Sequence, residues 1–292
     1  MIIGIYSRSI GKSSISVLNK IMTFLTERNV TVFLYKHVCD DDCLSLLEVE
    51  PNAWFDSHRE VDAHWNMMIS LGGDGTFLET VTYVRNKEIP ILGVNIGRLG
   101  FLADIALNEI EQALAQVYQN KFTIEKRALI KLDASGFIDS SFNYGLNDFT
   151  IRKSDKATLI KIHTWINGEF LNTYWADGLI VSTPTGSTAY SLSVGGPIVV
   201  PESNNFIISP IASHNLTVRP LVVDSAHEIK MTVESRSTTH IASLDARSFY
   251  FERDLTFTLS RADFYINVVK IEGHSFFSTI RNKLMWGIDK RN

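Results

Sequence analysis

The chain has 292 residues, of which 45% are hydrophobic and 21% are charged, with a net charge of -4. Domains of roughly 100–200 residues are usual, so the length predicts two domains, each able to bury its own core. The acidic balance argues against a protein built mainly to bind nucleic acid, which normally carries a basic face. The apolar N-terminus is short and precedes its basic residues, the reverse of a secretory signal. No stretch approaches the roughly 20 apolar residues of a membrane span, so we expect a cytoplasmic protein with no membrane partner.

The two cysteines, Cys39 and Cys43, flank three consecutive aspartates. A structural zinc ion needs four ligands, and no second cluster of Cys or His with ligand spacing accompanies this pair. We therefore expect an acidic surface loop with two incidental thiols, and we assign no metal-ligating residues.

The first 125 residues or so alternate short apolar runs with helical periodicity. Strands are predicted at Ile2–Tyr6, Val30–Tyr35, Met67–Leu71 and Ile89–Val94, and helices at Ser14–Glu27, Phe77–Arg85 and Asn108–Gln119. Strands that alternate with helices indicate a parallel sheet with helices on its faces. The fold class of this part is α/β.

From about Phe122 the pattern changes to strands and turns. Thr164–Ile166 and Glu169–Leu171 flank Asn167-Gly168, a strong two-residue hairpin signal, and three later segments alternate in twos: Ile229–Val233, Leu255–Leu259 and Phe264–Val268. We predict an all-β, sandwich-like second domain. The domains are placed at 1–123 and 124–270. In the tail, 271–292, the helical spacing of Phe277, Ile280 and Leu284 predicts a short packing helix.

The strongest local signal is Gly72-Gly73-Asp74-Gly75-Thr76, between a predicted strand and a predicted helix. Free backbone N–H groups and the helix dipole favour phosphate there, and glycines let it approach closely. A carboxylate at Asp74 would repel that anion, unless it accepts a proton from an attacking hydroxyl or helps to hold Mg²⁺. The alternative is that Asp74 only caps the helix.

Two other segments carry possible binding groups. The run from Asp177 to Ser191 passes from an apolar strand into a turn dense in hydroxyls and is followed by Gly195-Gly196-Pro197. Hydroxyls and free amides there suit phosphate or ribose, and Tyr190 suits stacking on a base. Asn147-Asp148 suits an adenine edge or ribose hydroxyls, although a loop cap is an equal alternative.

At this point the motifs resemble those of the bacterial NAD kinase family. Three blocks match in order: Gly72–Thr76, Asn147-Asp148, and Asp177 through Pro197, with support from the glycine-rich run that ends at Phe101. The first block is shared with diacylglycerol and sphingosine kinases, so the hydroxyl-rich block discriminates between the families. The resemblance covers roughly residues 65–225.

The resemblance implies transfer of the γ-phosphate of ATP to the 2′-hydroxyl of the adenosine ribose of NAD, which lies between the domains. It implies that the tail, 271–292, packs back on the first domain. It also implies ATP as donor, Mg²⁺ held mainly through the ATP phosphates, and a homo-oligomer, either a dimer or a tetramer. Asp74 would be the base. The nucleotide-binding residues would be Gly72, Gly73, Gly75, Thr76, Phe101, Asn147, Asp148, Asp177, Thr188, Ala189, Tyr190 and Ser193.

Two departures from the family pattern stand out. The family usually has Asn-Glu where this chain has Asn147-Asp148, so the carboxylate is one methylene shorter, and some relatives carry Arg at the position of Trp175. No dedicated lysine is evident at the phosphate loop, so Mg²⁺ and backbone amides are expected to supply most of the positive field. Two rival functions stay open: a lipid kinase that shares the first motif, and a non-catalytic NAD(P) sensor.

Overall fold

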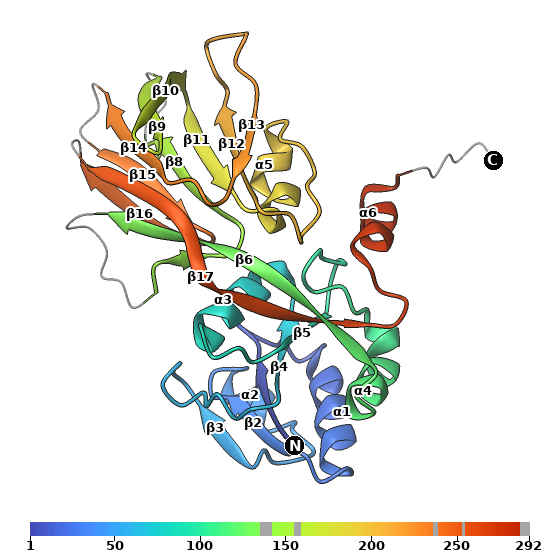
Figure 1. Ribbon diagram of the computed structural model, residues 1–292. Helices are drawn as coiled ribbons and strands as arrows, with labels where there is room; N and C mark the ends of the chain where they lie inside the picture. Colours follow the sequence, from blue (N-terminus) through green and yellow to red (C-terminus); the bar gives the residue numbers. More distant parts are fainter. Residues whose placement is uncertain (135–141, 155–158, 236–238, 253–254, 287–292) are drawn as a thin grey trace. The chain divides into compact units, whose positions relative to one another are not determined.

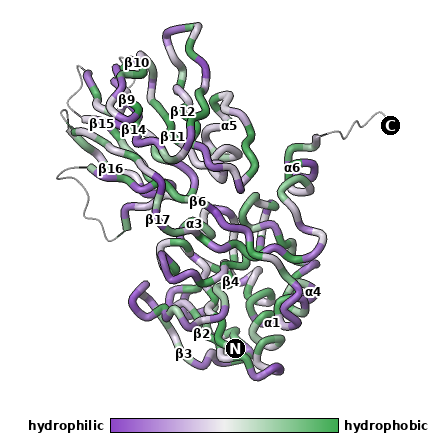
Figure 2. The backbone as a smooth tube through the Cα atoms, in the orientation of Figure 1, coloured by the Kyte–Doolittle hydropathy of each residue, from purple (hydrophilic) through white to green (hydrophobic). Residues whose placement is uncertain are grey.

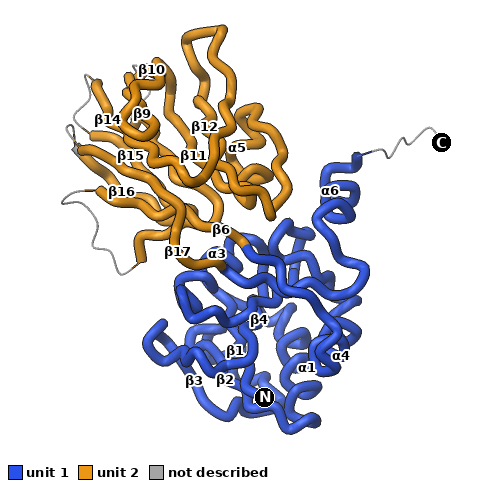
Figure 3. The backbone as a smooth tube through the Cα atoms, in the orientation of Figure 1, with its two compact units in different colours: residues 1–126, 266–292 blue, residues 127–265 orange. Residues whose placement is uncertain are grey.

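The computed structural model describes residues 1–134, 142–154, 159–235, 239–252 and 255–286 (Figure 1). The chain divides into two compact units. Unit 1 combines residues 1–126 with 266–292, and unit 2 consists of residues 127–265 (Figure 3). Two strands, β6 (Phe122–Ala134) and β17 (Thr256–Ile271), contribute residues to both units.

Unit 1 is built on a parallel sheet. Its strands lie in the order β5-β4-β1-β2-β3, with bounds β1 Ile2–Tyr6, β2 Thr31–Tyr35, β3 Ala53–Phe55, β4 Met67–Gly72 and β5 Ile91–Asn95. The last part of β17 joins this sheet beside β5, where Val268 pairs with Ile91 in parallel. All residues of β4 and β5 are buried, as expected for central strands covered on both faces.

Helices cover both faces of this sheet. The buried residues of α1 (Ile15–Thr26) and α4 (Ile110–Tyr118) form one hydrophobic cluster with Ile3 and Ile5 of β1. Successive strand residues point to opposite faces, and Tyr6 meets Tyr83 of α3 (Asp74–Val84) with ring centroids 4.7 Å apart. The helix α3 therefore covers the other face, and the predicted α/β architecture is confirmed.

A buried ion pair joins the end of β17 to the segment after β5. Lys270 Nζ lies 2.5 Å from Asp104 Oδ2, and the two side chains are only 6% and 4% exposed. Such a pair contributes little net stability, but removing one partner would leave an uncompensated buried charge. This contact fixes where the chain runs between β5 and the short 3₁₀ turn η1 (Leu107–Glu109) that precedes α4.

Unit 2 is an antiparallel sandwich, as predicted. One sheet has the strand order β13-β12-β11-β8-β15-β16, with bounds Leu221–Asp224, Asn205–Ile211, Gly178–Ser182, Asp148–Lys153, Thr239–Leu244 and Arg247–Glu252. The other contains β10 (Glu169–Ala176), β9 (Ile160–Ile166), β14 (Ile229–Glu234) and β17, with β6 and β7 (Tyr144–Gly145) attached. One hydrophobic cluster draws residues such as Phe149 and Phe257 from both sheets.

The predicted hairpin at Asn167-Gly168 is confirmed, because it joins β9 to β10 and both residues have positive φ, 50° and 82°. Other expectations were wrong in detail. The helix α3 begins at Asp74 rather than at Phe77, and β17 is one 16-residue strand where two were predicted. The short helix α2 (Asp41–Leu44) and β3 lie in a stretch that the sequence pattern left irregular.

The cysteines do not lie on the surface. Cys39 and Cys43 are 9% and 1% exposed, and both belong to the hydrophobic cluster of unit 1. The expected acidic surface loop is therefore wrong for the thiols, because α2 turns Cys43 inward while Asp41 and Asp42 stay exposed. Free cysteine behaves as a small hydrophobic residue, which suits this position.

The tail forms α6 (Phe276–Leu284), which contains both hydrophobic and hydrophilic residues (Figure 2). Ser275 caps it by accepting a hydrogen bond from the N–H of Ser278 at 3.1 Å. Its buried residues are Phe276, Thr279 and Ile280, whereas Phe277 is 60% exposed. Phe276 therefore packs inward in place of the predicted Phe277. The Ser275 cap fixes where the helix begins, and the starting point decides which side chains face the core. No helix in the described ranges is long and apolar enough to cross a membrane.

Candidate functional site

Asp74 lies in the first turn of α3, and its carboxylate accepts hydrogen bonds from three consecutive backbone N–H groups. Oδ2 accepts from Phe101 at 2.9 Å, and Oδ1 accepts from Leu102 at 2.9 Å and from Ala103 at 3.0 Å. No side chain caps the start of α3, where Gly73 is the N-cap residue. The helix-cap interpretation of Asp74 is therefore wrong, because its side chain holds a distant segment and not the amides of its own helix.

The approach of this segment to Asp74 depends on a glycine. A Cβ atom on Gly100 would lie 1.9 Å from Asp74 Oδ1, so no other residue fits there without moving the carboxylate. The turn before it is held by Asn95, which accepts a hydrogen bond from Gly97 N–H at 2.6 Å and donates one to the carbonyl of Arg98 at 2.6 Å. The glycine-rich run after β5 thus serves to present backbone amides to Asp74.

The predicted phosphate loop has two kinds of glycine. A Cβ atom on Gly72 would lie 2.3 Å from Thr76 Oγ1, so Gly72 is needed for packing within the loop. Gly73 and Gly75 are exposed, and a Cβ atom on either would meet nothing within 4 Å. The N–H groups of the first helical turn have no partner within α3, so open space and free donors coincide here. This geometry suits the close approach of an anion.

A lysine from the tail lies beside Asp74. Lys283, near the end of α6, places Nζ 3.5 Å from Asp74 Oδ2 and 4.4 Å from the centre of the Phe101 ring. No lysine was evident at this loop in the sequence, and the fold brings Lys283 beside it. Sequence reasoning missed Lys283 because it lies 209 residues from Asp74, and no local pattern marks it.

In unit 2, most hydroxyls of the Asp177–Ser191 block are buried, and most of the buried ones bond either within the turn or to neighbouring segments of the unit. Thr183 Oγ1 donates to the carbonyl of Leu146 at 2.6 Å, and Ser187 Oγ donates to that of Pro184 at 2.6 Å. Ser191 Oγ lies 3.1 Å from Ser209 Oγ. These hydroxyls therefore stabilise the turn, which contains η2 (Thr185–Thr188) and α5 (Tyr190–Ser193), and do not face solvent.

The predicted binding residues at the end of this block are the accessible ones. Tyr190 and Ser193 are exposed, and Thr188 and Ala189 are half-buried. Asp177 is half-buried and forms an ion pair with Lys153, with Nζ 2.6 Å from Oδ1. Trp175, where some relatives carry Arg, is 48% exposed. The Nζ atom of Lys161 lies over the Trp175 ring, 5.1 Å from the ring centre.

Asn147 and Asp148 are held by the carboxylate of Asp245, which no motif in the sequence marks. Asp245 accepts hydrogen bonds from the N–H groups of Leu146, Asn147 and Asp148 at 2.8, 2.7 and 3.2 Å. The carbonyl of Asn147 accepts from Thr183 N–H at 2.9 Å, and a Cβ atom on Gly186 would lie 2.0 Å from that carbonyl oxygen. Asn147 and the hydroxyl-rich turn therefore form one packed structure within unit 2.

Asp148 is buried, and its pKa is raised well above the ordinary value of an aspartate. Burial, and next the charge of Asp245, raise the pKa of Asp148 to about 7, although a hydrogen bond from Thr150 at 3.0 Å opposes the shift. Burial raises the pKa of Asp245 as well, whereas its three backbone N–H donors and the charge of Arg247 oppose that shift. Among the described residues Asp148 lacks such donors, so we assign the negative charge of this pair to Asp245 and the proton to Asp148.

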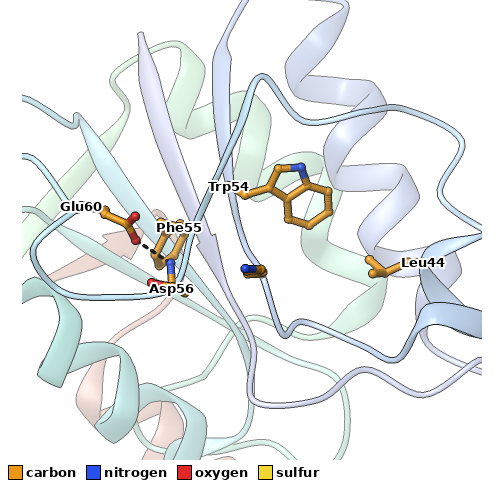
Figure 4. Close-up of a pocket in the computed structure, with 6 residues that line it drawn as sticks. Leu44, Trp54, Phe55, Asp56 and Glu60 are labelled. Carbon is orange, nitrogen blue, oxygen red and sulfur yellow. Dashed lines mark hydrogen bonds between the residues drawn. The ribbon is translucent and has the colours of Figure 1, made fainter.

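Among the described residues, no group of three or more His, Cys, Asp or Glu side chains is arranged to hold a metal ion. A cavity of about 430 Å³ lies at the ends of β2 and β3, lined by Lys36, Leu44, Trp54, Phe55, Asp56 and Glu60 (Figure 4). Glu60 Oε2 accepts there from Asp56 N–H at 2.8 Å. None of the predicted site residues lines this cavity.

We predict that Gly100→Ala destabilises the protein by about 1–3 kcal/mol, because the added methyl group overlaps Asp74 Oδ1 and forces the carboxylate or the segment to shift. Gly97→Ala is the matched control in the same loop, since its Cβ atom would meet only Asn95 Oδ1 at 3.9 Å. Chemical denaturation of both variants checks this. Equal stability of the two would show that Asp74 does not need this close approach.

We also predict a pH effect that depends on Asp148. The folded protein holds the Asp148 proton more tightly than the unfolded chain, whose pKa is near 3.8, so the stabilisation is complete below that pH. It is lost as pH rises towards about 7, with a slope of at most about 1.4 kcal/mol per pH unit. Asp148→Asn should flatten this part of the curve relative to the wild type. Parallel stability curves between pH 4 and 7 would contradict the assignment.

The sequence matches two domain families over most of its length. Residues 3–122 match the ATP-NAD kinase N-terminal domain, and residues 146–271 match the ATP-NAD kinase C-terminal domain. The second match includes the hydroxyl-rich block, so the lipid-kinase alternative is not favoured. The non-catalytic sensor is not favoured either, because the curated relatives described below are named as kinases.

The curated relatives include the NAD kinase of Flavobacterium psychrophilum, which is 42% identical over the full length of both chains. The NAD kinase of Bacteroides fragilis is 49% identical over 84% of this chain and 83% of its own. Among solved structures, yeast NADH kinase complexed with NADH has a TM-score of 0.88 at 22% identity, covering 99% of this chain and 88% of that one.

An NAD kinase from Archaeoglobus fulgidus in complex with ATP has a TM-score of 0.76 at 24% identity, and the likeness covers 98% of this chain and 99% of that one. At these identities the two structures support the fold alone. The family assignment rests on the two domain matches and on the full-length match to a curated relative. They show that the chain belongs to the NAD kinase family.

Proposed function

We propose that this chain transfers the γ-phosphate of ATP to the 2′-hydroxyl of the adenosine ribose of NAD, giving NADP and ADP. The observation that carries the proposal is the Asp74 carboxylate, held by three backbone amides beside exposed Gly73 and Gly75. An ionised carboxylate offers about four acceptor positions, and the amides take three of them. The fourth, on Oδ2, faces Lys283 and suits a substrate hydroxyl.

In this proposal Asp74 is the base. The hydroxyl is protonated at neutral pH, and a carboxylate need accept its proton only late, because phosphoryl transfer relies mainly on positioning and charge neutralisation. The three hydrogen bonds from backbone amides hold the carboxylate in place and leave its fourth acceptor position unused. The same bonds place Phe101, whose N–H is one of the donors, at the edge of the phosphate loop.

The phosphate loop of unit 1, with Gly72, Gly73, Gly75 and Thr76, is proposed to bind the ATP phosphates. Mg²⁺ would be bound chiefly by those phosphates, which is the usual mode for this ion. The metal would neutralise charge on the transferring group, while the chain's own amides orient that group.

Unit 2 is proposed to bind NAD through residues of two segments: Asn147, Asp148, Asp177, Thr188, Ala189, Tyr190 and Ser193. The exposed ring of Tyr190 suits stacking on a base, and the protonated Asp148 would donate rather than accept a hydrogen bond. The division into a nucleotide-phosphate domain at 1–123, an NAD-binding domain at 124–270 and a tail at 271–292 is part of the same proposal. So are the cytoplasmic location and a homo-oligomer of two or four copies.

The proposal predicts that purified protein forms NADP from NAD and Mg·ATP and leaves diacylglycerol and sphingosine unphosphorylated. The choice of acceptor rests on the accessible residues at the end of the hydroxyl-rich block, Tyr190 and Ser193, which suit a nucleotide rather than a lipid. Enzymatic assay of NADP, with reactions lacking ATP as the control, measures the first product, and labelled ATP measures transfer to lipid. Lipid phosphorylation without NADP would refute the proposal.

We predict that Asp74→Asn lowers kcat by about 10²–10⁴-fold and leaves NAD affinity nearly unchanged, because the base acts in the transition state. The new amide also places a donor opposite Phe101 N–H or its neighbours, so a stability loss of about 1–3 kcal/mol is expected. Single-turnover NADP formation across a Mg²⁺ series, on folded protein, is the measurement.

Asp42→Asn is the control for Asp74→Asn, since Asp42 is an exposed carboxylate of the same unit, with its side chain 79% accessible. Recovery of rate at high Mg²⁺ would instead indicate that Asp74 holds the metal. Near-normal turnover at ordinary Mg²⁺ would remove Asp74 from the catalytic role.

A further inference from the structure

The helix α6 brings one cation to the carboxylate of Asp74. The Nζ atom of Lys283 lies 3.5 Å from Asp74 Oδ2, longer than the ~2.7–2.9 Å of a strong charge-assisted hydrogen bond. The same ammonium lies 4.4 Å from the centre of the Phe101 ring, and both Lys283 and Asp74 side chains are 31% exposed. The contact is therefore loose, solvent-accessible and shared between two partners.

Lys283 is not needed to dock the helix that carries it. The helix α6 is anchored by buried Phe276, Thr279 and Ile280, and its start is capped by Ser275. Lys283 lies in the last turn, where the helix dipole favours a cation and the flexible stem leaves the ammonium free to move by several ångströms. A lysine placed in this way is suited to exchanging partners.

The charges around the loop favour a protein cation in addition to the Mg²⁺ that ATP would bring. Asp74 is negative, and an ATP bound at the first turn of α3 would bring several more negative charges beside it. Exposed Gly73 and Gly75 offer backbone amides there but no formal positive charge. Among the ion pairs of the described residues, the partner of Asp74 is Lys283.

We propose that Lys283 is a phosphate-binding catalytic residue of the reaction proposed above, on which this inference rests. In the free protein its ammonium covers the fourth acceptor position of Asp74, on Oδ2. When ATP binds, the ammonium moves to an oxygen of the γ-phosphate, and Oδ2 is exposed to the acceptor hydroxyl. The ribose oxygen then bonds to phosphorus, the bond to the bridging oxygen breaks with its electron pair leaving on ADP, and the hydroxyl proton passes to Oδ2.

The test is a binding measurement, so that it does not depend on turnover. Lys283→Met keeps the stem over Phe101 and removes the charge, whereas Lys283→Arg keeps the charge. Arg281→Met is the matched control, because Arg281 is exposed and lies two residues earlier in α6. Each change is made in the wild type and in Asp74→Asn, and affinity for the β,γ-imido analogue of ATP with Mg²⁺ is measured by calorimetry.

Lys283→Met is expected to weaken binding of the analogue by about 10- to 100-fold, the loss of one hydrogen bond to a charged group. The weakening should persist in Asp74→Asn, because the phosphate contact does not require the carboxylate. Lys283→Arg should retain most of the affinity, and Arg281→Met should change it little. Affinity for NAD, measured without the analogue, should not change in any of these variants.

Three results would overturn the inference: no weakening in Lys283→Met, an equal weakening in Arg281→Met, or a weakening that disappears in Asp74→Asn. The last would mean that Lys283 acts only by holding Asp74. If Lys283→Met does not give a normal melting transition, Lys283→Gln takes its place in the same comparison. A wild type that binds the analogue but forms no NADP would refute the proposed function and leave the binding test of Lys283 intact.

Discussion

The geometry of unit 1 depends on one carboxylate that binds a run of three backbone amides. Asp74 ties the start of α3 to the segment after β5, and that segment can approach only because Gly100 has no side chain. The next residue after the three amides, Asp104, is fixed from the other side by buried Lys270. The chain leaves β4 at Asp74 and leaves β5 towards residues 101–104, and hydrogen bonds join these two segments. The carboxyl ends of β4 and β5 are therefore held together at one edge of the sheet.

Unit 2 also contains a carboxylate that binds three consecutive backbone amides. Asp245 binds the three consecutive N–H groups of residues 146–148, as Asp74 binds those of residues 101–103. Asp245 is half-buried near Arg247, which itself donates to the carbonyls of Phe142 and Tyr144, so the charge of Asp245 is compensated within the protein. Asp74 is partly exposed and its cation is loosely held. The Asp245 carboxylate therefore holds its three amides with a compensated charge, whereas Asp74 retains an acceptor position on Oδ2 that only a loosely held cation covers.

Local patterns predicted the elements whose causes are local. The apolar run Ile2–Tyr6 and the hairpin at Asn167-Gly168 were predicted correctly, because buried strands and positive-φ turns have short-range signatures. The start of α3 was misplaced because glycines usually break helices, whereas here Gly73 is the N-cap. The inward turn of Cys43 and the rotation of α6 depend on tertiary packing, which an acidic or apolar pattern does not reveal.

The site was predicted in part for the same reason. The loop from Gly72 to Thr76 is a contiguous motif, and its position between β4 and α3 follows from the sequence. Asp245 and Lys283 lie 98 and 209 residues from the groups they contact, and neither has a distinctive neighbourhood in the sequence. Their roles arise from the fold, which brings a lone aspartate and a lone lysine to segments that the motifs had already marked.

The connectivity of β17 has a consequence for how the chain folds. Unit 2 is continuous from residue 127 to 265, whereas unit 1 is interrupted by it and is completed only by residues 266–292. A fragment ending before β17 would leave Asp104 buried without Lys270, and the sheet of unit 1 without its strand beside β5. During synthesis the inserted sandwich of unit 2 can therefore acquire its core first. Unit 1 must wait for the returning strand β17, a long-range contact of the kind that slows folding.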